Sequence, residues 1–351
     1  MADSFLAQLG IQYPIIQAPM AGTATVALAA AVSNAGGLGS LGLGASDVGQ
    51  ARRQIRELKQ ATAGPFNVNF FCHQAAPVEP VRNQQWLNVL APYFTEFGAH
   101  VPIEIAPAYP SFNDNPDLLA MLLSERPAVV SFHFGLPNQA SIEALQTAGI
   151  KLLGCATNVD EAELIIEAGL DGIIAQGVEA GGHRGVFDPA QDLELGLFGL
   201  LQLLRRQCSL PIIAAGGIMN GQGIRQVLSM GASAVQLGTA FVLCPESNAS
   251  ADYRAHLGSA KAYHTGITTM ISGRPARGLV NRWHQKLGVY GAKLAAYPTA
   301  YSAAKALHLA ASQRGCHDFA AYWAGQGAPL VRALPAAELM KTLIAELASD
   351  E

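Results

Sequence analysis

The segment Pro211–Thr239 reads PIIAAGGIMNGQGIRQVLSMGASAVQLGT, and it contains the repeating unit from which the fold is predicted. It begins with the apolar run Pro211–Ala215, continues through a helical pattern at Gly221–Met230, and ends with the apolar run Ala234–Gly238. Both runs are continuous rather than alternating in hydrophobicity, which is typical of parallel strands buried on both faces. The segment is therefore predicted to form one strand–helix–strand unit of a parallel sheet.

The same alternation extends through the first two thirds of the chain. Six more apolar runs predict strands at Pro14–Pro19, Gly37–Leu43, Phe66–Phe71, Ala128–Phe134, Lys151–Ala156 and Gly172–Gln176. Amphipathic helical patterns lie between several runs, at Asp47–Gln60, Asn138–Ala148, Asn158–Ala168 and Leu193–Gln207. Eight strands, each followed by a crossover, predict an α/β fold of the closed (β/α)₈ TIM-barrel type. An open doubly wound sheet is the competing architecture, but it normally carries its glycine fingerprint after the first strand, whereas Gly-rich turns here follow several strands.

The spacing of the predicted strands also divides the chain. Residues 73–126 are too long for one crossover and predict an insertion, with a helix at Val81–Phe97 and an extended piece around Ile103–Tyr109. The strand rhythm stops after Phe241. We therefore expect a barrel over residues 1–241 and a second, mostly helical subdomain over residues 242–351 that packs on the barrel mouth.

Composition excludes several classes of protein. The 351 residues are half hydrophobic, which is enough for a large core, and the formal net charge of −4 gives no reason to expect nucleic acid or an anionic membrane as partner. The first residues lack the basic region followed by an apolar one that is typical of a secretory signal. The apolar stretch Thr23–Gly44 is broken by paired glycines, which makes it a poor membrane span. Five widely spaced cysteines without a CxxC predict neither disulfides nor a metal site. We expect a cytoplasmic enzyme that is a monomer or a small homo-oligomer.

Two glycine turns follow the last two predicted strands. Gly216-Gly217-Ile218 follows one strand and Gly238-Thr239 follows the other. In barrels of this kind, loops after strands seven and eight commonly bind a phosphate through free backbone N–H groups, and a missing Cβ lets the anion approach. The alternative is that these are tight turns that need glycine only for positive φ. Because the two turns follow the seventh and eighth strands, where barrels of this kind bind phosphate, a phosphate site is favoured.

The loop after the sixth strand, Glu179–Gly185 (EAGGHRG), carries a histidine between glycines. An imidazole accepts or donates a proton near neutral pH, which suits His183 to general acid–base catalysis at a carbon acid. A solvated loop histidine is the alternative. The neighbouring charges Glu179 and Arg184 are predicted to pair with each other.

Other strand ends carry groups that suit a ligand. Ala18–Gly22 (APMAG) is a rigid turn after the first strand. Asn69 and Gln176 end the third and sixth strands, and each amide can donate and accept together, as the pyrimidine edge of a flavin requires. The alternative for either amide is that it caps backbone groups at the strand end. His133 ends the fourth strand, where it either contacts the ligand or is a buried core residue.

Taken together, these motifs resemble those of the nitronate monooxygenases, formerly called 2-nitropropane dioxygenases. They are most similar to the larger class, which prefers propionate 3-nitronate. The matching stretches span essentially the whole chain: Gln17–Gly22, Ala31–Gly39, Asn67–Asn69, Ser131–Pro137, Gln176–Gly185, Ala214–Ile218, Gln236–Thr239 and Ser272–Arg277.

The resemblance implies that FMN is held without a covalent bond. It implies that the phosphate of FMN binds to the two glycine turns and that the flavin ring lies against the Ala18–Gly22 turn. It also implies that the amides of Asn69 and Gln176 contact the polar edge of that ring. The expected FMN-binding residues are Pro19, Met20, Gly22, Asn69, His133, Gln176, Gly181, Gly182, Gly216, Gly217, Ile218, Gln236, Leu237, Gly238, Thr239 and Ala240.

The resemblance also implies the reaction. A nitronate is oxidised with O₂ to an aldehyde or ketone plus nitrite, and His183 matches the catalytic histidine of the family. A neutral nitroalkane must first lose its α-proton to a base, for which His183 is the candidate.

Propionate 3-nitronate also carries a carboxylate, so a selective pocket needs a cation or hydroxyl donors. Tyr301 and Lys305 are four residues apart on a predicted helix after Pro298. Together with Tyr297 and Tyr109 they converge if both segments fold over the barrel mouth, and the resemblance implies the same. A surface lysine and packed tyrosines are the alternative.

Two other functions stay open at this point. Flavin-dependent enoyl-ACP reductases and NADH:quinone reductases also carry a Gly-Gly-His loop, although the longer insertion, the Ser131–Pro137 stretch and the extended C-terminal region count against them. A barrel that binds a flavin or phosphate ligand without turnover is disfavoured by His183.

Overall fold

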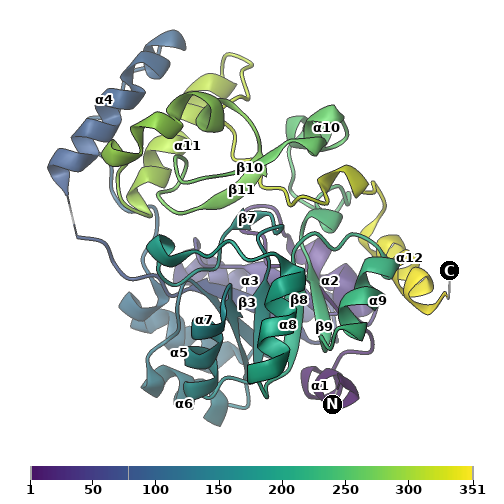
Figure 1. Cartoon of the computed structure of the whole chain (residues 1–351). Coiled ribbons are helices and arrows are strands. Elements are labelled where there is room, and N and C mark those ends of the chain that lie inside the picture. The colour runs from purple at the N-terminus through teal and green to yellow at the C-terminus, as the bar shows by residue number, and fades with distance from the viewer. Residues whose placement is uncertain (1, 78, 350–351) are drawn as a thin grey trace.

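The computed structural model describes residues 2–77 and 79–349, and its core is a barrel of eight parallel strands (Figure 1). The strands are β1 (Ile15–Gln17), β2 (Gly39–Gly42), β3 (Phe66–Phe71), β4 (Val129–His133), β5 (Lys151–Ala156), β6 (Gly172–Gln176), β8 (Ile212–Ala215) and β9 (Ala234–Leu237). They pair in the order β1-β9-β8-β6-β5-β4-β3-β2, and a bridge between Ile16 and Leu38 brings β2 back to β1. Nearly all strand residues are buried, as continuous apolar runs predict. The predicted TIM barrel is confirmed.

Helices join the strands, and most of them begin at a capping side chain. They are α2 (Val26–Asn34), α3 (Val48–Ala61), α5 (Pro116–Glu125), α6 (Gln139–Thr147), α7 (Val159–Glu167), α8 (Leu197–Gln207) and α9 (Gly221–Ser229). Before α3, α6, α7 and α9, the side chains of Asp47, Asn138, Asn158 and Asn220 each accept a hydrogen bond from the backbone N–H three residues on. Each cap satisfies a donor that the first turn of a helix leaves unpaired.

The sequence-based bounds agree closely with this barrel. All eight predicted strands are present, and β3, β5 and β6 have the predicted ends. The insertion departs from expectation, because it contains α4 (Pro80–Glu96) and also α5. Residues 103–109, predicted to be an extended piece, form no strand in the described chain.

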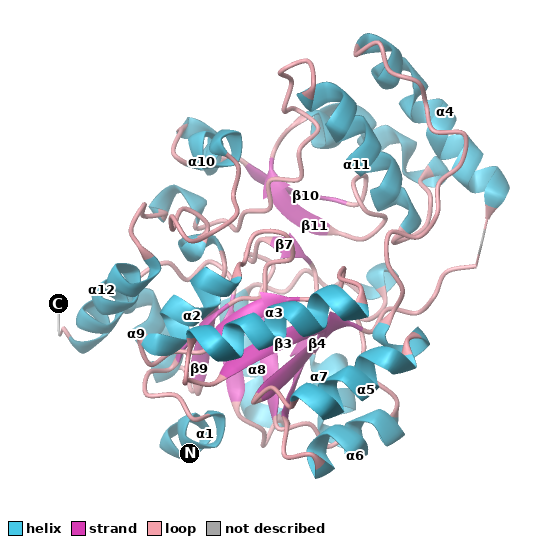
Figure 2. Cartoon of the chain, turned by 180° about the vertical axis from the view of Figure 1, so that it is seen from behind, coloured by secondary structure: helices cyan, strands magenta, loops and turns pink. Residues whose placement is uncertain are grey.

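A second layer lies over one end of the barrel (Figures 1 and 2). Helix α4 of the insertion packs on α11 (Thr299–Ser312), and the rings of Trp86 and Trp283 stack at 6.5 Å between centroids. The layer also contains α10 (Ala251–Leu257) and the strands β10 (Thr265–Thr268) and β11 (Ala276–Leu279). These strands form an antiparallel sheet with β7 (Gly182–His183), which is part of the loop after β6. The small sheet was not predicted, and it joins the layer to the barrel.

The last helix corrects the expected arrangement of residues 242–351. Helix α12 (Ala336–Ala348) lies against α2 and α9 on the side of the barrel and not on its mouth (Figure 1). Its residues Leu339, Met340 and Leu343 belong to the same buried cluster as the barrel helices. The chain therefore returns to the barrel after forming the second layer.

Within residues 2–77 and 79–349, no helix is long and apolar enough to cross a membrane. No group of three or more His, Cys, Asp or Glu side chains in those ranges is arranged to hold a metal ion. The cysteines are free, and Cys72, Cys155, Cys208 and Cys244 are buried.

Candidate functional site

A cavity lies between the carboxyl ends of the barrel strands and the second layer. Most of the residues predicted from the sequence line it: Pro19, Met20, Asn69, Tyr109, His133, Gln176, Gly181, Gly182, His183, Gly216, Gly217, Ile218, Gln236, Leu237, Gly238, Thr239 and Tyr301. Four others do not. Gly22 comes directly after the lining residue Ala21, and the buried Ala240 comes directly after Thr239. Tyr297 contacts the lining residue Tyr109, and Lys305 contacts the lining residue Tyr301.

The two glycine turns form a cradle of free backbone donors. Gly216 and Gly217 have φ of +127° and +69°, which favour glycine over other residues. Among the hydrogen bonds of the described residues, none is donated by the backbone N–H of Gly217, Ile218 or Gly238. The hydroxyl oxygen of Thr239 accepts from the backbone N–H of Gly325, 3.0 Å away, which leaves its own hydrogen available.

Helix α9, which follows the first turn, does not supply these donors. Its capping residue Asn220 accepts from the N–H of Gly223 at 2.8 Å. An anion in the cradle is therefore bound by loop N–H groups, while the helix end is already capped.

Asn69 and His133 form one hydrogen-bonded unit with Ser131. The amide nitrogen of Asn69 donates its two hydrogens to the carbonyl and hydroxyl oxygens of Ser131, both at 3.0 Å, and lies 3.2 Å from Nδ1 of His133. Burial lowers the pKa of His133 to about 4, so its ring is neutral near neutral pH.

Gln176 holds the loop that carries the candidate catalytic histidine. Its Nε2 donates to the carbonyl of His183 at 3.1 Å, and its Oε1 accepts from the N–H of Gly185 at 2.8 Å and from Arg184 at 3.2 Å. Most of the hydrogen-bonding capacity of this amide is therefore used within the loop, although the residue also lines the cavity.

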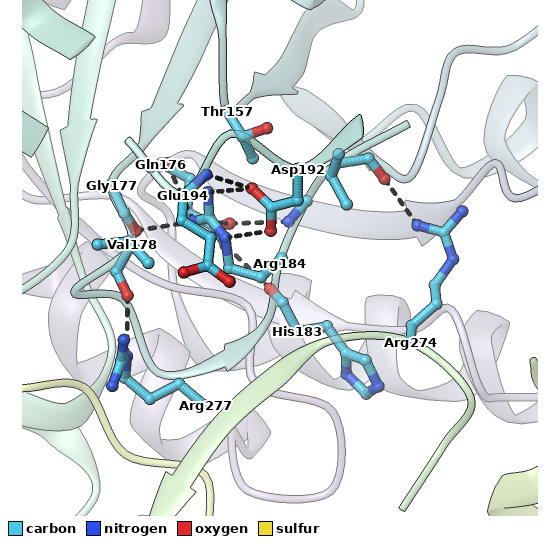
Figure 3. A network of polar contacts seen from close by, with 12 residues as sticks. Thr157, Gln176, Gly177, Val178, His183, Arg184, Asp192, Glu194, Arg274 and Arg277 are labelled. Atoms are coloured by element: carbon cyan, nitrogen blue, oxygen red, sulfur yellow. Dashed lines mark hydrogen bonds and ion pairs between the residues drawn. The ribbon is translucent and has the colours of Figure 1, made fainter. Parts of the chain in front are cut away.

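The charged residues of this loop pair differently from the prediction. The buried guanidinium of Arg184 donates to both carboxylate oxygens of Asp192, at 2.9 and 3.1 Å, and to the carbonyl of Gly177 at 2.9 Å (Figure 3). Glu179 instead accepts from the backbone N–H of Leu197 at 2.9 Å, at the start of α8. The predicted Glu179–Arg184 pair is wrong because each side chain stabilises a different part of the loop.

His183 is fixed by its backbone and by its ring. Its backbone pairs with Ala276 of β11, and its Nε2 lies 2.8 Å from the hydroxyl oxygen of Ser272. The rings of Trp323 and Phe134 lie 5.3 and 5.7 Å from the imidazole, centroid to centroid. Burial and the positive charge of Arg274 lower the pKa of His183 to about 3. His183 is therefore neutral near neutral pH, and the lowered pKa also means that its ring holds an added proton weakly.

Arg274 is the charged residue at the site that the sequence did not single out. It is buried, and its guanidinium donates to the carbonyls of Val186 at 2.6 Å and Phe187 at 2.9 Å. Its Cζ atom lies 4.7 Å from the centre of the Phe134 ring and 5.4 Å from that of Tyr297. The residue belongs to the Ser272–Arg277 stretch, whose only sequence signal is the family resemblance.

Three further residues near the site are not indicated by the sequence motifs above. Trp323 lines the cavity from the second layer, and Tyr253, which also lines it, donates from its hydroxyl to the Trp323 carbonyl. His73 is buried with its ring 4.9 Å from Tyr297, and its pKa is lowered to about 4, first by burial and then by Arg274. Trp323 and Tyr253 reach the site through tertiary folding alone, whereas His73 stands two residues after β3, at a strand end where the barrel rule predicts ligand contacts.

The predicted substrate residues form a connected group beside His183. The hydroxyls of Tyr109 and Tyr297 lie 2.9 Å apart, and both are buried. Helix α11 begins after Pro298, as predicted, and carries Tyr301 and Lys305. The ammonium nitrogen of Lys305 lies 4.7 Å from the centre of the Tyr301 ring, so it is separated from the cavity by that ring.

Known proteins resemble this chain over its full length. The family model for nitronate monooxygenase matches residues 3–346. A nitronate monooxygenase from Pseudomonas aeruginosa is 55% identical over 349 residues, which is 99% of each chain. One from Paraburkholderia phytofirmans is 52% identical and covers 98% of this chain and 94% of that one. The structure of nitroalkane oxidase from Streptomyces ansochromogenes has a TM-score of 0.90 and 38% identity, with 98% of each chain covered.

The structural match agrees with the barrel fold. Because the family model and the relatives span almost the entire sequence, the chain belongs to the nitronate monooxygenase family and is an oxidoreductase.

Proposed function

We propose that the enzyme binds FMN at the carboxyl ends of the barrel strands and oxidises alkyl nitronates, including propionate 3-nitronate, with O₂. The products are an aldehyde or ketone and nitrite. The observation that supports this most strongly is that the cradle of free N–H groups and the neutral imidazole of His183 open on the same cavity.

The residues around the cavity fit FMN on two independent counts. The N–H groups of Gly217, Ile218 and Gly238 are free to hold a terminal phosphate, which needs several donors at once. Gln236 is buried, and within the described chain its Oε1 accepts no hydrogen bond. An unpaired buried acceptor is costly, and a hydroxyl-bearing chain such as the ribityl group supplies the missing donor. Bound FMN supplies the redox chemistry, accepting electrons from the nitronate and delivering them to O₂.

The protein's own part in the reaction is to bind, orient and move a proton. His183 accepts the α-proton of a neutral nitroalkane, and beside a preformed nitronate it serves to orient the anion. The nearby guanidinium of Arg274 makes the potential at this position positive, which favours an anionic substrate. The rings of Phe134 and Trp323 pack against the imidazole and give it apolar surroundings.

The first prediction concerns the cofactor. We expect the purified protein to be yellow and to release FMN, and no FAD, on denaturation. One glycine cradle provides for one terminal phosphate, and the sequence carries no separate dinucleotide fingerprint for an adenylate. Chromatography of the released flavin checks this. Stoichiometric FAD, or a colourless protein that FMN does not reconstitute, would contradict the proposed cofactor.

The second prediction concerns the carboxylate of propionate 3-nitronate. We propose that the hydroxyls of Tyr109 and Tyr301 bind it, and that the exposed ammonium group of Lys305, which lies behind the Tyr301 ring, reaches around that ring to pair with it. A charge-assisted hydrogen bond contributes about 1.5–3 kcal/mol, so Lys305→Met should raise KM for propionate 3-nitronate by roughly ten- to a hundredfold. The nitronate of nitroethane, which lacks a carboxylate, should be oxidised as before.

Parallel steady-state kinetics on the two nitronates decide this prediction. Lys341→Met is the matched control, because Lys341 is exposed on α12 and, among the residues that the structure describes, pairs only with Glu338. An equal effect of Lys305→Met on both substrates would mean that Lys305 acts on the nitronate or the flavin. No effect on either would place it outside the binding site.

A flavin-dependent NAD(P)H reductase, acting on a quinone or an enoyl-ACP, is the alternative function. Nitrite release in air separates the two proposals. The proposed enzyme forms nitrite from propionate 3-nitronate while it consumes O₂, without any nicotinamide. A flavin-loaded protein that releases no nitrite from any alkyl nitronate rules out the proposed function.

A further inference from the structure

The hydroxyl of Ser272 is the direct hydrogen-bond partner of the His183 ring, and nothing in the reaction as described so far uses it. Ser272 is fully buried, and its Oγ lies 2.8 Å from Nε2 of His183. It belongs to the segment between β10 and β11, which pairs with the histidine loop: His183 is opposite Ala276, and the N–H of Arg184 donates to the carbonyl of Pro275 at 2.9 Å. The second layer of the protein therefore supplies this contact.

The hydrogen bonds of Ser272 fix which atom carries each proton. Besides His183, its Oγ has two partners at 3.2 Å: it accepts from the backbone N–H of Arg274 and can donate to the carbonyl of Arg274. A serine hydroxyl has one hydrogen and two lone pairs. Its hydrogen must therefore go either to the Arg274 carbonyl or to Nε2 of His183.

The Arg274 carbonyl decides between the two. Among the hydrogen bonds of residues 2–77 and 79–349, it accepts only from Ser272, and Arg274 is buried. A buried carbonyl without a donor is costly, so the serine hydrogen is held there. Nε2 of His183 is then the donor to Ser272. In this arrangement the serine's hydrogen and both of its lone pairs are all satisfied.

We propose that Ser272 is a positioning residue that selects the catalytic tautomer of His183, by holding the ring proton on Nε2 and leaving the lone pair of Nδ1 for the substrate. The hydrogen bond made by one ring nitrogen determines which nitrogen is protonated. In the described chain Nδ1 of His183 has no hydrogen-bond partner, and the ring lines the cavity. This inference rests on the proposed role of His183 as a base toward nitroalkanes.

The proton transfer balances in this arrangement. Nδ1 of His183 takes the α-proton of the nitroalkane, the C–H electron pair becomes part of the C=N bond of the nitronate, and the π pair of one N–O bond moves onto that oxygen. The resulting imidazolium still donates from Nε2 to Ser272, because Ser272 only accepts there. The hydrogen bond that orients the ring therefore persists through the transfer. The opposite tautomer would present an N–H to the substrate and could not take its proton.

The tautomer is measured directly by NMR of protein labelled with ¹⁵N at histidine and purified with its bound cofactor. The His183 signals are those that disappear in His183→Asn. We expect a protonated Nε2 and an unprotonated Nδ1 in the unmodified protein. In Ser272→Ala a proton on Nε2 would be buried without an acceptor, so the ratio should shift toward protonated Nδ1 by about tenfold or more.

Ser247→Ala is the matched control, since Ser247 is also buried and accepts from a backbone N–H two residues on, but it does not contact His183. It should leave the His183 signals unchanged, and Ser272→Thr should retain the original tautomer. A protonated Nδ1 in the unmodified protein, or an unchanged tautomer in Ser272→Ala, overturns the proposal. If Ser272→Ala does not fold, the tautomer of the unmodified protein decides alone. The NMR measurement of the His183 tautomer needs no turnover. An enzyme that releases no nitrite would reject the proposed function, but the tautomer could still be measured and would still test the role of Ser272.

Discussion

Replacing His183 by asparagine is expected to lower kcat/KM for nitroethane by about 10²–10⁴-fold while FMN stays bound, since a positioned general base contributes about that much. Asparagine keeps much of the reach of the side chain and can form hydrogen bonds, but it cannot take a proton near neutral pH. The loss should be smaller for the preformed nitronate, which needs no deprotonation. Steady-state kinetics on both substrates, with the flavin absorbance as a check of loading, measure the effect.

His264→Asn is the control for this prediction, because His264 is an exposed histidine of the second layer that does not line the cavity. It should leave both activities unchanged. A His183→Asn variant within a factor of about two of the unmodified enzyme on both substrates would lie below any plausible acid–base contribution. That outcome would exclude His183 as the base.

The second large effect is expected at the glycine cradle. Gly217→Val should weaken FMN binding by roughly tenfold to a hundredfold for each N–H bond lost to the phosphate, since a bond to a charged group contributes about 1.5–3 kcal/mol. Gly217 has φ of +69°, which disfavours a β-branched residue, and a Cβ there would lie 3.3 Å from that of Glu179. Either effect moves the N–H groups of the turn. FMN titration of the apo protein measures the change.

The strain of valine at positive φ must be separated from the loss of binding. Gly169→Val provides the control: Gly169 has φ of +78°, a Cβ there would meet nothing within 4 Å, and it does not line the cavity. Both variants should lose similar stability, about 1–2 kcal/mol for a left-handed residue. Only Gly217→Val should lose FMN affinity. Equal affinity in the two variants would mean that the Gly216–Gly217 turn is purely structural.

The barrel was predictable because its signal is local. Each strand is a short continuous apolar run, and polar capping residues such as Asn138, Asn158 and Asn220 mark where helices begin. Helix α2 was not named among the predicted helices, since it is alanine-rich and mostly buried and has no polar face to reveal its period. The pairing of β7 with β11 joins residues far apart in the chain, and no local pattern indicates it.

The candidate site likewise contains residues that local sequence predicts and residues that only the tertiary fold brings together. The glycine turns and His183 occur at strand ends, where the rules of the barrel predict ligand contacts. Ser272, Arg274 and Trp323 come from the second layer, and their positions depend on how that layer folds over the barrel. Glu179 and Arg184 are close in sequence, which suggested a pair, but the folded loop gives each a better partner.

The central claim is that a nitronate, and no nicotinamide, is the reductant that this site accepts. It is tested by mixing the flavin-loaded enzyme, without oxygen, with propionate 3-nitronate, NADH and NADPH in separate experiments, and following the flavin absorbance. We expect propionate 3-nitronate to bleach the oxidised flavin spectrum at a rate that accounts for turnover, and both nicotinamides to leave it unchanged. Rapid reduction by NADH or NADPH, with no response to propionate 3-nitronate, would contradict the account and assign the enzyme to the reductases.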